Sequence, residues 1–507
     1  MNNKSSSGIQ IFFLLIIMMI SIIAGHTRAQ STQGIISGEV RDAATKQPLP
    51  GANIIIVGTN IGAASNEIGY YVIKNVPPGK YIIKASMIGY EPSAFTDLIV
   101  NPNRNHSVMF ELHPAIMEMS EVNVTADYFS KPVENTVSFR TITPEEIRRS
   151  PGSAEDIFRV MQSLPGVATA GARSAQLIVR GGSPDENLTL LDGIEVYNPI
   201  HFARTGESMG IISIVNPALL QKVDFLTGGF PAKYGDKMSS VFDLSLREGN
   251  KEIFNTDANL NIAGFGVMLD GPVIENSNMV FSIRRGFFDL ITSALNRPAA
   301  PSYYDAVGKI TYAVNKNNRI SLVGFYYLDQ IERTGSTKEK NVTWNRYDYL
   351  TRDDYGAAIG VNWRSLITEK TFSLVTASYT SNGWNTLQGT ESEPTLMGEE
   401  IREDEFSLKS ELNFQLFTNI NLKIGGQFKI INSNNESWIP EDTLRTGRII
   451  PANTISYQPE ATTKGALFLQ SSFRIIDPLI ITASLRYDYF ALTTENNFSP
   501  RISLSYN

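Results

Sequence analysis

Four patterns of hydrophobic and polar residues follow one another along the chain. Residues 11–20 form one unbroken apolar run. Residues 34–113 contain short strand-like runs separated by Gly- and Pro-rich turns, and residues 127–248 mix such runs with two helix-like stretches. From residue 249 to residue 507, apolar and polar side chains alternate over runs of about ten residues. The chain is therefore predicted to be mainly β, with three domains behind an N-terminal apolar segment.

The N-terminal apolar segment predicts an export signal. Lys4 precedes it, and the small residues Thr27 and Ala29 stand at positions −3 and −1 of a cleavage site before Gln30. The alternative is a membrane anchor, but the apolar run is shorter than the ~20 residues that a spanning helix needs. We therefore expect residues 1–29 to be a signal peptide.

Residues 34–113 predict a small all-β domain, because the strand-like runs have the spacing of a sandwich. Several motifs resemble the carboxypeptidase regulatory-like domain: Gly38-x-Val40, PL-x-GANI at 48–54, Gly58-Thr59, Asn66-x-x-Gly69-Tyr70-Tyr71, Pro78-Gly79-x-Tyr81 and Gly89-Tyr90. The resemblance implies a prealbumin-like β-sandwich without a catalytic role.

The next segment, residues 117–126, has the sequence MEMSEVNVTA and alternates polar and apolar residues in its second half. An extended segment of this kind can bind a partner by adding a strand to its sheet. A last strand of the sandwich and a plain linker are the alternatives. In outer-membrane receptors whose plug follows such a β domain, the pattern resembles the TonB box. That resemblance assigns TonB binding to Glu121, Val122, Asn123, Val124 and Thr125.

Residues 127–248 predict a mixed α/β domain. One helix is expected to begin after Thr143, an N-cap residue followed by Pro144, and a second helix is expected over 153–161. Five motifs resemble, in order and spacing, the plug domain of TonB-dependent receptors: LPGV at 164–167, IVRGG at 178–182, LLDGI at 190–194, VDFLTGG at 223–229 and YGDKMSSVFDL at 234–244. The resemblance implies a domain that lies inside a barrel.

Two loops of this domain, residues 183–187 and 197–204, combine polar and aromatic side chains, the mixture that small-ligand sites use. Ordinary plug turns are the alternative. The predicted ligand-binding residues at the plug apex are Ser183, Asp185, Glu186, Asn187, Tyr197, Asn198, His201 and Phe202.

Residues 249–507 predict strands of an antiparallel transmembrane β-barrel. Apolar residues recur at every second position, as at Ile320, Leu322 and Tyr326, and the run 258–268 predicts a single strand. A soluble all-β protein is the alternative. Short turns alternate with long polar segments at 329–353, 381–404 and 432–464, an asymmetry typical of outer-membrane barrels.

The strand count predicts that the barrel is only partial. Roughly eleven strand-like runs are present, whereas plugged outer-membrane transporters have ~22 strands. The sequence stops within a strand-like run at 501–507. We therefore expect residues 249–507 to be the N-terminal part of a barrel in a C-terminally incomplete chain.

The composition excludes several classes of site and of binding partner. The 507 residues include no Cys and four His, and 44 Lys+Arg against 51 Asp+Glu give a net charge of −7. The absence of Cys excludes a disulfide scaffold, a thiolate metal site and a lipid-anchored lipoprotein. The acidic balance disfavours nucleic acid as a partner. Because the histidines lack metal-ligand spacing and no nucleophile motif is present, we predict no catalytic residue, no metal, no cofactor and no enzyme activity.

Taken together, the resemblances imply a TonB-dependent receptor in the cell outer membrane. Its function would be energy-coupled uptake of a scarce nutrient. Its partners would be TonB in the periplasm, outer-membrane lipid, and an extracellular small ligand or its complex. The ligand stays open among the siderophore, cobalamin, peptide and glycan classes. The alternative is a surface binding or adhesion protein that uses the β-sandwich as its interaction module.

Overall fold

The computed structural model describes most of the chain from residue 33 onward. The described residues are 33–100, 105–114, 138–153, 156–169, 175, 177–202, 212–261, 264–289, 299–333, 349–368, 370–390, 395–417, 419–443, 449–476 and 479–506. The predicted signal peptide and the predicted TonB box both lie outside them. No helix in the described part of the chain is long and apolar enough to cross a bilayer.

The first domain is a β-sandwich. Its strands are β1 (Gly34–Asp42), β2 (Asn53–Ile56), β3 (Gly62–Ala64), β4 (Tyr70–Val76), β5 (Gly79–Ser86), β6 (Ser93–Val100), β7 (Asn105–Ser107) and β8 (Phe110–Leu112). One sheet has the order β4-β1-β7, with β8 also pairing with β1, and the other has the order β3-β2-β5-β6. Alternating residues such as Ile54, Ile56 and Ile83 fill the space between the sheets.

Gly69 shows how closely this sandwich is packed. Its φ is +73°, and an added Cβ would lie 2.6 Å from the carbonyl oxygen of Val40. The same region carries the backbone hydrogen bond from the Val40 N–H to the Gly69 oxygen, of 2.8 Å. Only glycine therefore fits both the conformation and the space at this position.

The second domain is the α/β segment. Its elements are β9 (Ser138–Ile142), α2 (Pro144–Arg149), α3 (Ile157–Met161), β10 (Val167–Ala168), β11 (Ile178–Val179), η1 (Pro184–Glu186), β12 (Asn187–Leu191), β13 (Ile194–Glu195), β14 (Ile200–His201), β15 (Ile212–Ser213), η2 (Pro217–Leu219), β16 (Leu220–Thr227) and β17 (Ser240–Leu246). The main sheet has the order β13-β12-β17-β16-β9, so β9 is an edge strand.

The two helices begin at side-chain caps. The Thr143 side chain accepts a hydrogen bond from the Glu146 N–H, and Pro144 opens α2, as the sequence predicted. The prediction of a second helix over 153–161 is wrong at its start. Helix α3 covers only its last turn, because the carboxylate of Asp156 caps it by accepting from the Arg159 N–H.

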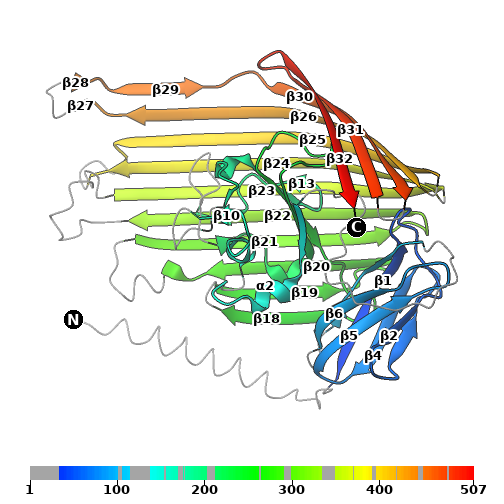
Figure 1. Ribbon diagram of the computed structural model, residues 1–507. Helices are drawn as coiled ribbons and strands as arrows, with labels where there is room; N and C mark the ends of the chain where they lie inside the picture. Colours follow the sequence, from blue (N-terminus) through cyan, green and yellow to red (C-terminus); the bar gives the residue numbers. More distant parts are fainter. Residues whose placement is uncertain are drawn as a thin grey trace, which may run out of the picture.

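The third domain is one large antiparallel sheet. In pairing order its strands are β18 (Asn255–Asn261), β19 (Gly264–Gly271), β20 (Ser277–Gly286), β21 (Ala299–Ala313), β22 (Asn318–Arg333), β23 (Tyr349–Thr368), β24 (Thr371–Gly389), β25 (Met397–Phe417), β26 (Ile420–Ile439), β30 (Thr462–Ile476), β31 (Leu479–Phe490) and β32 (Glu495–Tyr506). Strand β29 (Asn453–Tyr457) also pairs with β26, and β27 (Asp442–Thr443) and β28 (Ile449–Ile450) form a separate hairpin. The sheet curves around the second domain (Figure 1).

The prediction of a single strand over 258–268 is wrong, because that run is the hairpin of β18 and β19. Gly264 has φ +149°, and a Cβ there would lie 2.2 Å from the Arg285 oxygen. Glycine at this position thus permits the chain to turn back between β18 and β19. The turn was not predicted because the alternation of apolar residues continues through it. The mainly β fold class, with a sandwich, an α/β domain and an antiparallel barrel-type sheet, is confirmed.

The two faces of the large sheet differ in chemistry. Ile320, Leu322 and Tyr326 are exposed on one face of β22, while Val323 and Phe325 are buried on the other. The buried face packs against the second domain in one shared core. The exposed apolar side chains continue across neighbouring strands and form a band of the kind that contacts lipid.

The two ends of the sheet differ in the length of the connections between strands. At one end, β21 is joined to β22 and β23 to β24 by short turns. At the other end, β22 ends at Arg333 and β23 begins at Tyr349, and β26 and β30 are also far apart in sequence. The β-sandwich lies at the end with the short turns (Figure 1).

Candidate functional site

The candidate site is the interface between the α/β domain and the inner face of the large sheet, because this is where the predicted ligand-binding residues lie. The hairpin of β12 and β13 brings the two predicted loops together. The Val196 N–H donates to the Thr189 oxygen over 2.9 Å, so the returning chain reaches the level of Asn187. Residues 183–187 and 197–202 therefore lie at the same end of this hairpin.

The first predicted group, Ser183, Asp185, Glu186 and Asn187, surrounds the short helix η1. The Glu186 carboxylate accepts from the Ser239 hydroxyl over 2.5 Å, and the Asn187 amide donates to the Leu177 oxygen over 2.9 Å. These contacts hold the turn within its own domain. Ser183 and Asp185 are exposed, so they remain accessible to a ligand.

The second predicted group contacts the barrel wall. The Tyr197 hydroxyl donates to the Glu405 carboxylate of β25. Lys429 of β26 donates to Glu405 over 3.1 Å and to Glu195 over 2.6 Å. Asn198 is also buried. Tyr197 therefore belongs to a cluster of two carboxylates and one ammonium that joins the two domains.

His201 is the centre of a second cluster. Its side chain is fully buried, its Nδ1 lies 2.6 Å from Asp329 Oδ1, and its Nε2 lies 3.0 Å from Asp305 Oδ2. The imidazolium form of the ring carries a hydrogen on both nitrogens and can therefore donate to both carboxylates at once. The Phe202 N–H donates to the other oxygen of Asp329. The loop is thus bonded to β21 and β22 at the same time.

Arg284 of β20 completes this cluster. Its guanidinium donates to both oxygens of Asp305, at 3.0 and 3.1 Å from Nε, and to the Ser213 oxygen over 2.7 Å. Two cations are therefore in direct contact with two buried carboxylates. The His201 ring also stacks on Tyr303 with 4.1 Å between ring centroids.

The barrel residues of these two clusters were not predicted from the sequence. Arg284, Asp305, Asp329, Glu405 and Lys429 are charged residues at inward positions of otherwise alternating strands. A charge on the inner face of a barrel strand was the available signal. It does not identify the plug residue that the charge meets.

A cavity of about 350 Å³ runs between the plug and the wall. Charged side chains of both signs line it, among them Asp192, Lys309, Arg364, Lys409 and Glu411. Within the described residues, no group of three or more His, Cys, Asp or Glu could hold a metal ion. The charged side chains of this interface are suited to holding the two domains together.

Three family models match consecutive parts of the chain. They are the CarboxypepD_reg-like domain over residues 36–124, the TonB-dependent Receptor Plug Domain over residues 131–240, and the TonB dependent receptor-like beta-barrel over residues 278–507. The order is the one that the sequence motifs predicted.

Similar proteins are receptors and transporters. The ferrienterobactin receptor of Escherichia coli is 24% identical over 426 residues, which cover 72% of this chain and 56% of the relative. The TonB-dependent receptor SusC of Bacteroides thetaiotaomicron is 28% identical over 250 residues, covering 47% of this chain and 23% of the relative. The chain thus spans little more than half the length of the first of these relatives.

Solved structures agree on the fold. The outer membrane transporter YddB from Escherichia coli superposes with a TM-score of 0.55 at 13% identity, covering 74% of this chain and 60% of the other. The ferric enterobactin receptor PfeA of Pseudomonas aeruginosa gives 0.54 at 16% identity, covering 73% and 59%. The relatives are not enzymes, in agreement with the sequence prediction. The chain therefore belongs to the TonB-dependent receptor family and is an outer-membrane protein with a carboxypeptidase regulatory-like domain ahead of its plug.

Proposed function

We propose that the protein takes up a scarce nutrient across the outer membrane, driven by TonB. The observation that carries the proposal is the position of the plug, which packs on the inner face of the barrel and is bonded to it through buried ion pairs. A solute can pass through the barrel only if the plug moves. Ion pairs with discrete partners can break and re-form, which suits a plug that moves and returns.

The predicted TonB-binding residues, Glu121 to Thr125, stand in sequence between the sandwich and β9. Strand β9 is at the edge of the plug sheet and pairs only with β16 among the described strands. A pull on the segment 121–125 therefore acts first on an element with a single neighbour. This arrangement supports a mechanical role for TonB.

The ligand is proposed to be a small molecule or its complex, from the siderophore, cobalamin, peptide or glycan class. The residues proposed to contact it at the plug apex are Ser183, Asp185, Glu186, Asn187, Tyr197, Asn198, His201 and Phe202. Ser183 and Asp185 present exposed polar groups. Tyr197 and His201 attach the apex to the barrel wall through their bonds to Glu405 and Asp329. We propose that the ligand first meets the exposed Ser183 and Asp185, and that its contact with the partly buried Tyr197 and the buried His201 acts on their bonds to the barrel.

Uptake by cells tests this proposal. Residues 121–125 are replaced by a Gly-Ser sequence of equal length in the protein as expressed in its own cells, and residues 131–135 are replaced in the same way as the matched control. Uptake of ferric enterobactin, cyanocobalamin and labelled oligosaccharides is then measured. Loss of uptake of one probe in the first variant only is expected. Equal uptake in both variants would contradict TonB coupling.

A surface adhesion protein remains the second candidate, and the position of the sandwich disfavours it. The sandwich contacts the short turns of the barrel, through Lys316 and Glu67 and through Thr368 and Gln47. Short turns face the periplasm in outer-membrane barrels. An adhesion module would need to lie at the opposite end.

A further inference from the structure

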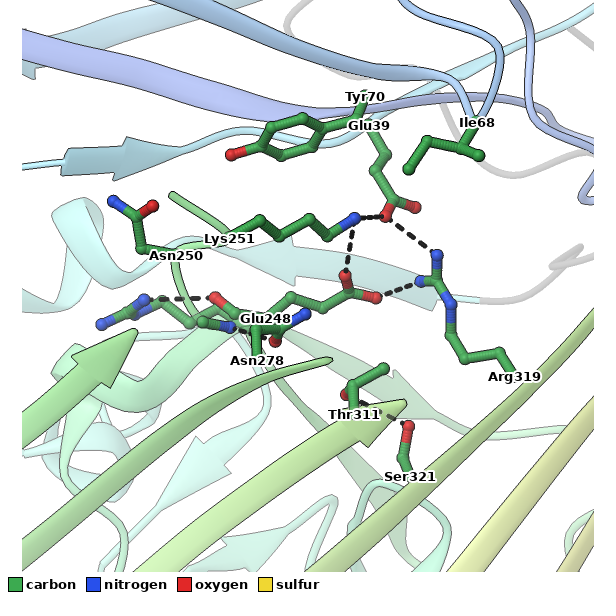
Figure 2. A network of polar contacts seen from close by, with 12 residues as sticks. Glu39, Ile68, Tyr70, Glu248, Asn250, Lys251, Asn278, Thr311, Arg319 and Ser321 are labelled. Atoms are coloured by element: carbon green, nitrogen blue, oxygen red, sulfur yellow. Dashed lines mark hydrogen bonds and ion pairs between the residues drawn. The ribbon is translucent and has the colours of Figure 1, made fainter. Parts of the chain in front are cut away.

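The β-sandwich is attached to the barrel and the plug by a compact cluster of charges. Glu39 of β1 lies 2.5 Å from the Lys251 ammonium and 2.9 Å from the Arg319 guanidinium, and it also pairs with Arg41 of its own strand. Glu248 pairs with Arg319 and lies 3.7 Å from Lys251. Figure 2 shows both carboxylates converging on the same two cations. Three separate parts of the chain meet here: the sandwich, the end of the plug and the start of β22.

Glu39 depends on the other domains for its charge partners. It is 3% exposed, and a buried carboxylate is stable only when it is paired. Burial raises its pKa, but attraction to Arg319, Arg41 and Lys251 outweighs burial and holds the pKa of the Glu39 carboxyl well below its usual range. Glu39 is therefore ionised while the sandwich is docked, and two of its three cations come from outside the sandwich.

Further polar contacts join the sandwich to the barrel and to the linker. Lys316 pairs with Glu67 over 2.9 Å, and Lys74 pairs with Glu252 over 2.8 Å. Lys251 also lies 4.5 Å from the centre of the Tyr70 ring. The apolar core of the sandwich shares no residue with the core of the plug and barrel in the described part of the chain. The sandwich therefore keeps its own core when these contacts break.

The docked sandwich lines one side of a partly open cavity of about 810 Å³. Arg41, Phe95 and Glu111 of the sandwich form one wall, and Lys222 of the plug forms the facing wall. The space reaches Lys309 on the inner face of the barrel. A solute that passes the plug on this side enters a space that the sandwich borders.

We propose that the β-sandwich is a reversible cap on the periplasmic end of the barrel, held closed by the cluster of Glu39, Glu248, Lys251 and Arg319. The cap opens by loss of these ion pairs while the sandwich stays folded. The proposal that the sandwich docks through this cluster does not depend on the proposed uptake function. The role of opening in transport rests on that function.

The absence of cysteine gives a clean test of docking. Glu67 and Lys316 are exposed at the rim, so the double variant E67C/K316C places two unique thiols on the two sides of the contact. The purified full chain in nanodiscs is treated with a cleavable bis-methanethiosulfonate crosslinker. Its spacer is chosen to span the gap that the shortened side chains at positions 67 and 316 leave. The crosslinking rate reports the docked fraction.

The variant R319Q, added to this pair, removes the cation that both carboxylates share. Its crosslinking rate is expected to fall roughly tenfold or more, because the buried Glu39 and the partly buried Glu248 both lose a partner. The matched control K84Q removes a charge of the sandwich outside the cluster and should leave the rate unchanged. Adding E39Q to R319Q should restore part of the rate, because one unpaired carboxylate is removed. An unchanged rate in R319Q would overturn the cap, and circular dichroism confirms that each variant is folded.

Uptake by cells carrying the crosslinked pair tests the role of opening. Uptake of the probe that the parent protein accepts should be lost after crosslinking and regained after the reagent is cleaved with dithiothreitol. Equal uptake before and after cleavage would refute the cap as a gate. No uptake by the parent or by the cleaved protein would instead refute the proposed function, so the two failures are distinguishable.

Discussion

Replacing His201 by Gln should loosen the plug from the barrel. His201 is fully buried between Asp305 and Asp329, whose side chains are 1% and 2% exposed. The substitution removes one of the two cations in the cluster and leaves two buried carboxylates with Arg284 alone. Breaking a buried ion pair by removing one partner costs about 3–5 kcal/mol. We expect the opening free energy of β14 and β15 to fall by this amount.

Amide hydrogen exchange measures this opening directly. A loss of about 3–5 kcal/mol corresponds to exchange that is faster by between about 100-fold and about 4,000-fold, since each 1.4 kcal/mol is tenfold. His113→Gln, at a half-buried histidine of the sandwich, is the matched control and should leave exchange in the plug unchanged. The double variant H201Q/D329N removes the unpaired carboxylate and should recover most of the protection. Unchanged exchange in H201Q would refute the ionic account of plug anchoring.

Three further predictions follow from other contacts. K429M leaves Glu195 and Glu405 without their shared ammonium, so amide hydrogen exchange in β13 should become faster by on the order of 100-fold or more. The triple variant K429M/E195Q/E405Q should restore the slow exchange. The rim crosslinking rate, divided by the rates at which the reagent labels the single-thiol variants E67C and K316C at the same pH, should stay constant from pH 8 down to about pH 5. The division is needed because the reagent attacks thiolates, whose fraction falls with pH. The pKa of Glu39 is lowered, so its contribution to docking is present above its ordinary value of ~4.3 and is lost only as pH falls through the folded value. A fall in this ratio near pH 6 would contradict the assignment to Glu39. Gly69→Ala should lower the thermal stability of the sandwich by about 1–3 kcal/mol, measured by calorimetry, because of its positive φ and the close Val40 oxygen.

The sequence predicted the elements whose signals are local. The Thr143 cap and Pro144 marked the start of α2, and the cap forms as expected. Outward residues of β22 such as Ile320 and Leu322 were predicted from period-two alternation and are exposed. In both cases a few neighbouring residues determine the outcome, so a single sequence contains the necessary information.

The sequence underestimated the length of the barrel strands. Segments 329–353 and 381–404 were predicted as long loops, yet β22 continues to Arg333, β24 to Gly389, and β25 begins at Met397. Nine to eleven residues suffice to cross a bilayer, and several strands have about twenty. Beyond the hydrocarbon region both faces of a strand meet polar surroundings, so the alternation disappears while the backbone pairing continues.

The long-range partners could not be predicted. Tyr197 and His201 were chosen as ligand contacts because they are polar or aromatic and lie in a loop, and the structure places them against Glu405, Asp305 and Asp329. These partners are more than one hundred residues away in sequence. Charge alone does not specify which inward-facing carboxylate meets which plug residue.

Binding of TonB to the purified chain is the most direct test of the account. The periplasmic domain of TonB from the same organism is titrated calorimetrically into the chain in nanodiscs, with residues 121–125 intact or replaced by a Gly-Ser sequence of equal length. The account predicts saturable binding to the intact chain and none to the replaced one. Equal binding to both, or no binding to either, would contradict it.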